Sequence, residues 1–191
     1  MGEFQLERDI IKTYIENRLQ RKLEKDQKDL RILSEGDLQS CVYYHLRDLI
    51  RRKKLSKHWY LTNKLAMGKQ RRDKMFPDIV IVRMKDTGKV KPTFLIELKE
   101  HESYHAQSVK DDLEKLKRAS RRWHDVVQTY FILAAPDKNL DSKKIIEKME
   151  TVRNKIKARK VFLISVNVFH KLKGPEPGKW KDKYQRLKKL R

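Results

Sequence analysis

The chain has 191 residues, and its 48 lysine and arginine residues against 26 acidic ones give a formal net charge of +22 at pH 7. That length suits one domain, and the single cysteine, Cys41, excludes an intrachain disulfide and a cysteine zinc cluster. No apolar stretch approaches the roughly 18 residues of a transmembrane helix, and the first residues lack a signal-peptide core. We therefore expect a soluble, intracellular (cytoplasmic) protein with no membrane segment.

Basic residues gather in two segments, residues 51–75 and residues 171–191. Nucleic acid is the favoured partner because lysine and arginine release condensed counterions when they neutralise phosphates. An anionic membrane surface is the main alternative, but it would require a strongly amphipathic basic helix, which neither segment clearly forms. The residues of the first segment that we expect to contact nucleic acid are Arg51, Arg52, Lys53, Lys54, Lys69, Arg71, Arg72 and Lys74.

Apolar residues at three- and four-residue spacing predict a helix from residue 4 to about 30. Its charged second half, residues 21–31, is expected to extend into solvent, so that residues 1–33 form a helical extension. A second helix should begin after Ser34, a good N-cap, with Asp37 at the third helical position as in a capping box. Three strands are then predicted at the following ranges: 59–67, 77–84 and 92–99.

Helices and strands alternate in the second half of the chain. The ranges predicted there are a helix at 104–122, a strand at 126–135, a helix at 141–158 and a strand at 160–169. This order predicts a single mixed α/β domain over residues 1–173 whose later strands are joined by helical crossovers. The run Gly-Pro-Glu-Pro-Gly at 174–178 predicts a hinge before a basic tail that ends at residue 191, with Trp180 exposed.

Two carboxylates and an ammonium are expected to converge on the hairpin formed by the second and third strands. A turn at Thr87-Gly88 places Asp78 opposite Glu97, with their Cβ atoms about 5 Å apart. Lys99 follows two residues after Glu97 and so projects from the same face. The register can shift because Pro92 cannot donate to the ladder and suits a bulge.

The surroundings of these three residues are apolar, as expected for interior strands. Two carboxylates in such a place are costly unless they are paired or bind a cation, and Mg²⁺ takes few carboxylates while keeping several waters. The alternative is a buried carboxylate–lysine ion pair that satisfies itself. We favour a metal site.

The segment Phe76-Pro77-Asp78, an apolar strand, a hairpin and Ile96-Glu97-Leu98-Lys99 resembles the motif of the PD-(D/E)XK nuclease superfamily. The expected element order from about residue 34 to residue 169 is similar to that superfamily's αβββαβ core, the restriction-endonuclease-like fold with a central mixed sheet flanked by helices. The superfamily includes restriction enzymes, Holliday-junction resolvases, repair exonucleases and RNA-cleaving domains. The motif does not select one of these branches.

The resemblance implies metal-dependent hydrolysis of phosphodiester bonds. Asp78 and Glu97 would hold one or two Mg²⁺ or Mn²⁺ ions, and Lys99 would position water or neutralise developing charge. Many members have a further acidic residue on the preceding helix, and Glu35 is the candidate here, although an acid in a first helical turn is also favourable for the helix dipole alone. Expected rim residues, which would contact phosphate or solvent, are Gln39, His101, His105 and Gln107.

Three readings of the function remain open. DNA is favoured over RNA as substrate, and an RNA-cleaving endonuclease of the same superfamily is an alternative. A non-catalytic basic nucleic-acid-binding or assembly protein, in which the three residues form a structural ion pair, is the alternative from another class. A homodimer would supply two sites for cutting two strands.

Residues 111–116 are interpreted as part of an ordinary amphipathic helix.

Overall fold

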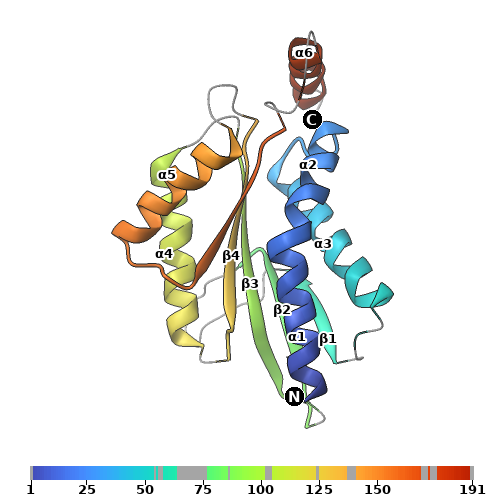
Figure 1. The fold of residues 1–191 in the computed structure, drawn as a ribbon, viewed down its shortest axis with the longest axis vertical. Helices are drawn as coiled ribbons and strands as arrows, with labels where there is room; N and C mark the ends of the chain where they lie inside the picture. Colours follow the sequence, from blue (N-terminus) through green and yellow to red (C-terminus); the bar gives the residue numbers. More distant parts are fainter. Residues whose placement is uncertain are drawn as a thin grey trace.

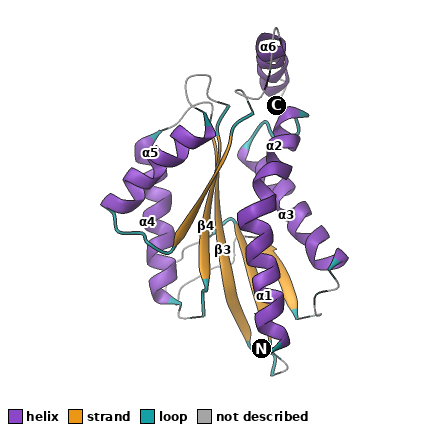
Figure 2. Ribbon diagram, in the orientation of Figure 1, coloured by secondary structure: helices purple, strands orange, loops and turns teal. Residues whose placement is uncertain are grey.

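The computed structural model describes residues 2–53, 55, 58–63, 77–85, 87–101, 105–123, 125–136, 141–168, 172 and 176–189. Figure 1 shows three layers, with a mixed sheet between two groups of helices. Helices α1, α2 and α3 cover one face of the sheet and helices α4 and α5 cover the other, as the secondary-structure colouring in Figure 2 makes plain. The predicted mixed α/β architecture is confirmed. None of the described helices is long and apolar enough to cross a membrane.

The first helical segment is continuous and follows the predicted boundaries closely. It consists of α1 (Glu3–Tyr14), a π-helical turn η1 (Ile15–Leu19) and α2 (Gln20–Lys28). The expectation that its charged half extends into solvent is wrong. Leu23 is fully buried, and the side chain of Gln27 accepts a hydrogen bond of 2.9 Å from the Val168 backbone N–H. Pattern alone missed this because α2 buries polar groups that are satisfied by partners distant in sequence.

Helix α3 (Glu35–Arg52) begins where its capping residues predict. Ser34 adopts extended backbone geometry, and its Oγ accepts a hydrogen bond of 3.2 Å from the Asp37 N–H. Asp37 Oδ2 in turn accepts hydrogen bonds from the Leu33 N–H and the Ser34 hydroxyl. This reciprocal arrangement satisfies backbone donors that the first helical turn leaves without intrahelical partners. It fixes the position of Glu35 in that turn.

The sheet has five strands in the order β1-β2-β3-β4-β5. The strands are β1 (Trp59–Asn63), β2 (Ile79–Met84), β3 (Val90–Glu100), β4 (Gln128–Ala134) and β5 (Val161–Val166). Strands β1, β2 and β3 pair antiparallel, whereas β3, β4 and β5 pair parallel. The parallel connections contain helices α4 (Ala106–Arg122) and α5 (Ser142–Lys155), as helical crossovers require.

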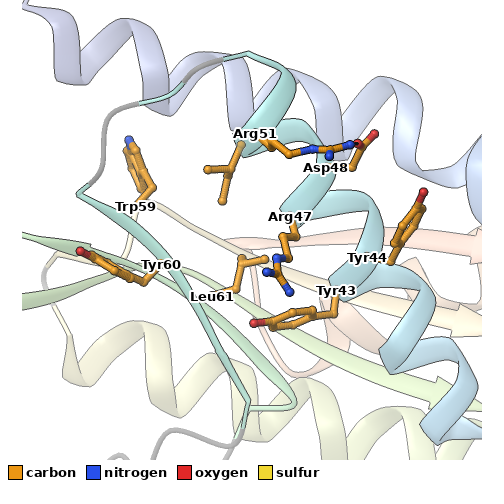
Figure 3. A pocket seen from close by; sticks show the side chains of 9 residues that line it. Tyr43, Tyr44, Arg47, Asp48, Arg51, Trp59, Tyr60 and Leu61 are labelled. Carbon is orange, nitrogen blue, oxygen red and sulfur yellow. Dashed lines mark hydrogen bonds and ion pairs between the residues drawn. The ribbon is translucent and has the colours of Figure 1, made fainter.

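Strand β1 lies at one edge of the sheet, beside the middle and C-terminal half of α3. A hollow of about 760 Å³ opens between them (Figure 3). Tyrosine and arginine side chains of α3 line it together with residues of β1.

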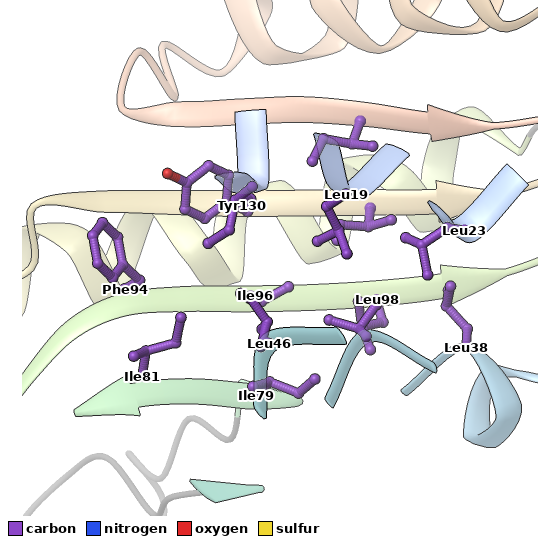
Figure 4. Packing of buried hydrophobic residues seen from close by; sticks show 14 of the residues in the cluster. Leu19, Leu23, Leu38, Leu46, Ile79, Ile81, Phe94, Ile96, Leu98 and Tyr130 are labelled. Atoms are coloured by element: carbon purple, nitrogen blue, oxygen red, sulfur yellow. The ribbon is translucent and has the colours of Figure 1, made fainter. Parts of the chain in front are cut away.

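Two apolar clusters hold the layers together, one on each face of the sheet. On the face of α1, α2 and α3, side chains of β2, β3 and β4 meet those of the helices; Figure 4 shows Ile96 and Leu98 of β3 with Leu19, Leu23 and Leu46. The second cluster packs the opposite side chains of the same strands against α4 and α5. Alternation along each strand therefore sends apolar groups to both faces, as expected for interior strands.

The segment expected to be a basic tail forms helix α6 (Glu176–Lys189). Its Trp180 is only 8% exposed and donates from Nε1 to the Lys28 carbonyl oxygen at 3.0 Å, so the expectation of an exposed Trp180 is wrong. Tyr184 stacks on Trp180 with ring centroids 5.1 Å apart and is itself buried. These two rings pack in a small cluster with Leu33 and Val168, which the sequence placed outside the tail.

Candidate active site at the ends of β2 and β3

The hairpin register brings Asp78 next to Glu97. Ile79 pairs with Ile96, so the residue before β2 falls opposite the next residue of β3, as predicted. The register shifts between Ile81 and Val82, which gives the bulge expected beside Pro92. The pairing on the turn side of this bulge is one residue out of step with the pairing at Ile79, so the bulge itself brings Asp78 opposite Glu97 rather than Ile96. Gly88 in the turn has φ of 73°, a backbone conformation that glycine adopts without steric cost.

Asp78 is held through both its side chain and its backbone. Its Oδ2 accepts a hydrogen bond of 2.8 Å from the Leu98 N–H. Its carbonyl oxygen accepts a hydrogen bond of 2.8 Å from Nε2 of Gln39 on α3. Gln39, predicted to be a rim residue, therefore lies at the site and orients the Asp78 backbone.

Glu97 is the most buried group of the site, with 4% of its surface exposed. Its Oε1 forms an ion pair of 2.5 Å with Lys115 Nζ of α4, whereas its Oε2 is buried and has no hydrogen-bond partner among the described residues. Burial, and next the negative charge of Asp78, raise the pKa of Glu97 to about 8, although Lys115 acts in the opposite direction. The pocket therefore disfavours the ionised form of Glu97, and a further cation beside its carboxyl would favour that form.

Lys99 and Glu35 meet at the exposed edge of the site. Lys99 Nζ lies 3.5 Å from Oε2 of Glu35, whose side chain is about half exposed. Partial burial disfavours the charged form of Lys99, but Glu35 and Asp112 outweigh it, so that the pKa of Lys99 is raised. The ammonium accordingly stays protonated. The structure thus brings together the four predicted site residues from α3, β3 and the start of β2.

Two residues of α4 join the site although the sequence interpretation assigned them to an ordinary amphipathic helix. The helix is amphipathic as interpreted, but the interpretation missed that Lys115 pairs with Glu97 and that Asp112 lies near Lys99 and Lys115. Burial, with a further contribution from the nearby carboxylates, raises the pKa of Asp112 despite the opposing charges of Lys99 and Lys115, and its Oδ2 is buried without a hydrogen-bond partner in the described chain. The sequence did contain a signal for Asp112. It lies three residues after Val109, a spacing that places both residues on the inward face of α4.

The other predicted rim residues lie at the N-terminal end of α4. His101 and His105 have ring centroids 4.1 Å apart, and burial together with the charge of His105 lowers the pKa of His101. The side chain of Gln107 donates to Asp111 on the next turn of the helix. The contacts described here for these three residues are with residues other than Asp78.

The predicted basic residues are only partly described. Arg51 and Arg52 are exposed at the end of α3 and both donate to Asp48, and Lys53 is exposed beside them. The remaining predicted contacts fall outside the described residues: Lys54, Lys69, Arg71, Arg72 and Lys74.

The donor set can be tested against the metal that the resemblance implies. Across the described ranges, no three histidine, cysteine, aspartate or glutamate side chains are grouped so as to hold a metal ion. Two carboxylates nevertheless suit Mg²⁺, which keeps several waters and takes only one or two carboxylates in many sites. The Oε2 atom of Glu97 is buried and has no hydrogen-bond partner in the described part of the chain, so it is the atom that a cation would satisfy. The residues present therefore fit a divalent ion with few protein ligands.

Comparison with known proteins adds no relative to these observations. No protein-family model, no curated protein and no solved structure matches the chain.

Proposed function

We propose that the chain is a metal-dependent nuclease of restriction-endonuclease-like fold that hydrolyses phosphodiester bonds in DNA. The observation that carries the proposal is the pairing of Asp78 with Glu97, whose buried Oε2 lacks a partner among the described residues. Supporting it, the elements from α3 to β4 follow the order α-β-β-β-α-β. The net charge of +22 favours a polyanionic substrate.

Asp78 and Glu97 would hold Mg²⁺ or Mn²⁺, with Glu35 as a further carboxylate at the exposed edge. When bound, the ion supplies an activated water nucleophile and stabilises negative charge on the phosphate. The Leu98 N–H and the Gln39 amide hold Asp78 in place before any ligand arrives. Such preorganisation keeps a carboxylate pair from rearranging during the reaction.

Lys99 supplies a fixed positive charge next to the carboxylates. Glu35 holds its ammonium at 3.5 Å, and the raised pKa keeps it protonated. A phosphate at the exposed edge would meet this ammonium, which would neutralise the charge that develops during cleavage. Lys115 has a different role. It contacts only Oε1 of Glu97, so Oε2 is left available for a cation.

The proposal is tested by incubating the protein with plasmid, linear, branched and single-stranded DNA, and with RNA of matched sequence. Each substrate is tested with Mg²⁺, with Mn²⁺ and with EDTA. We expect cleavage of DNA that requires the metal and is lost in Asp78→Asn, which retains an acceptor for the Leu98 N–H. The matched control is Asp125→Asn, an exposed carboxylate that pairs with Lys91 away from the site. Cleavage in EDTA would contradict the proposal. Preferential cleavage of RNA would show that RNA, not DNA, is the substrate.

A second function is favoured by one observation. The contact between Lys115 and Glu97 already gives this buried carboxyl a partner without metal, as expected of a non-catalytic DNA-binding or assembly protein. Thermal unfolding with and without Mg²⁺ or Mn²⁺ separates the two functions. A metal site stabilises the folded state by mass action, whereas a self-satisfied ion pair gives no metal-dependent shift of Tm.

A further inference from the structure

The outward side of α3 carries a groove of aromatic and cationic side chains. The hollow beside β1 and a smaller one of about 250 Å³ share Tyr43, Tyr44 and Arg47, so they form one continuous groove. Tyr44 is 64% exposed, an unusual state for a large aromatic side chain. Figure 3 shows Tyr43 and Arg47 projecting from α3 toward β1, whereas Tyr44 projects on the side of Asp48. We call this feature the α3 groove.

Positive charge in the α3 groove is suited to an anionic occupant. Arg51 donates to Asp48, which also accepts from Arg52, so these three groups largely satisfy one another. Arg47 is exposed and has no ion-pair partner in the part of the chain that the structure describes. An exposed guanidinium close to exposed tyrosine side chains is suited to a ligand that has phosphates and flat aromatic groups at short intervals.

The α3 groove leads to the candidate active site. Its smaller hollow is lined by Gln39, whose amide donates to the Asp78 carbonyl oxygen. Gln39 and Arg47 are eight residues apart on one helix, which corresponds to about 12 Å along its axis. A nucleic-acid strand that follows α3 past Arg47 is therefore guided toward Asp78.

We propose that the α3 groove binds an unpaired DNA strand, with bases stacked on Tyr43 and Tyr44 and a phosphate bound by Arg47. The faces of bases are covered by neighbouring bases within a duplex, so tyrosine rings can stack on them only where the strand is unpaired. This inference rests on the proposed nuclease function and narrows its substrate to DNA with a single-stranded segment. Stacking would set affinity without base selectivity, because every base has a π-face.

The test measures binding rather than cleavage, by fluorescence anisotropy with EDTA present so that no strand is cut. The probes are a labelled single-stranded 20-nucleotide DNA of mixed sequence and the duplex of the same sequence. We expect the wild type to prefer the single strand. Tyr44→Ala should weaken single-strand binding at least about fivefold and leave duplex binding nearly unchanged. Arg47→Ala should reduce the salt slope of single-strand binding by about 0.7, the value for one phosphate.

Two controls make the result specific to the groove. Tyr44→Phe keeps the aromatic ring and should bind like the wild type, and Lys143→Ala removes an exposed charge from α5 in the other helical layer. Equal affinity of wild type and Tyr44→Ala for the single strand would overturn the inference, as would a wild-type preference for duplex. Either of these binding results would leave the Asp78→Asn cleavage test unaffected. Conversely, metal-independent cleavage would contradict the proposed metal-dependent nuclease and would leave the binding result standing.

Discussion

The Glu97 carboxyl lies between Lys115 and Asp78 in a pocket that excludes water from most of its surface. Burial and the charge of Asp78 raise its pKa from an ordinary value near 4.5 to about 8. The folded protein therefore holds a proton that the unfolded chain has released over this pH range. It follows that the contribution of Glu97 to stability falls as pH rises from about 4.5 to 8.

Glu97→Gln should remove this pH dependence when EDTA keeps divalent ions away. The free energy of unfolding of the variant, measured in urea at pH 5 and at pH 8, should exceed that of the wild type at pH 8 by about 1–3 kcal/mol and by less at pH 5. The comparison of the two proteins at each pH cancels the titration of all other groups. A variant that is less stable than wild type at pH 8 would show that the ion pair with Lys115 outweighs the cost of burial.

Ser34 gives a second prediction, concerning the N-terminus of α3. Ser34→Ala removes the side-chain acceptor for the Asp37 N–H and should lower the free energy of unfolding by about 1 kcal/mol. Ser40→Ala in the same helix is the matched control, because its hydroxyl bonds only to the Gly36 carbonyl within the helix. Urea denaturation of the two variants should separate them; an equal loss in both would show that the cap contributes nothing particular.

Among the elements, α6 shows how a helix at the end of the chain reaches the neighbourhood of the site. The Tyr184 hydroxyl donates to Oε1 of Glu100 at 2.6 Å, and Lys188 lies 3.1 Å from the same oxygen. Glu100 directly follows Lys99 on β3. The contacts of α6 therefore stabilise the end of the strand that carries the candidate lysine.

Trp180→Ala should detach α6 from the rest of the protein. The substitution removes a buried ring, its stacking on Tyr184 and its hydrogen bond to Lys28, and we expect it to cost about 3 kcal/mol. Differential scanning calorimetry measures the loss, and Lys181→Ala on the exposed side of the same helix is the control. A Tm unchanged by Trp180→Ala would contradict the packing of α6 described above.

Much of the element order could be predicted from the sequence because local signals determined it. Apolar periodicity located the helices and strands, and the cap at Ser34 gave a helix boundary. The pairing of Asp78 with Glu97 was predicted from a two-residue turn, but in the structure it depends on the bulge between Ile81 and Val82. The burial of α2 and Trp180 could not be predicted, because each depends on contacts with residues far away in the chain. Asp112 and Lys115 were missed for the same reason: only the packing of α4 against the sheet brings them to Glu97.

At the scale of the whole molecule, the net charge of +22 predicts salt-sensitive binding of DNA. Lys179, Lys181 and Lys183 are exposed on α6, and replacing all three by glutamine should reduce the slope of log affinity against log salt by up to about 3 on duplex DNA. Replacing Lys143 and Lys144 on α5 is the control for charge alone. A slope unchanged by the α6 substitutions would mean that this helix does not contact phosphates.

The measurement that tests the central claim most directly is the rate of DNA cleavage by three variants of the carboxylate–lysine group. Asp78→Asn, Glu97→Gln and Lys99→Ala are compared with wild type, Asp125→Asn and Lys143→Ala, under single-turnover conditions in Mg²⁺ and in Mn²⁺. We predict that each of the first three loses at least about 100-fold in rate, whereas both controls cleave like the wild type. Cleavage by all three variants at the wild-type rate would contradict the assignment of the active site to the ends of β2 and β3.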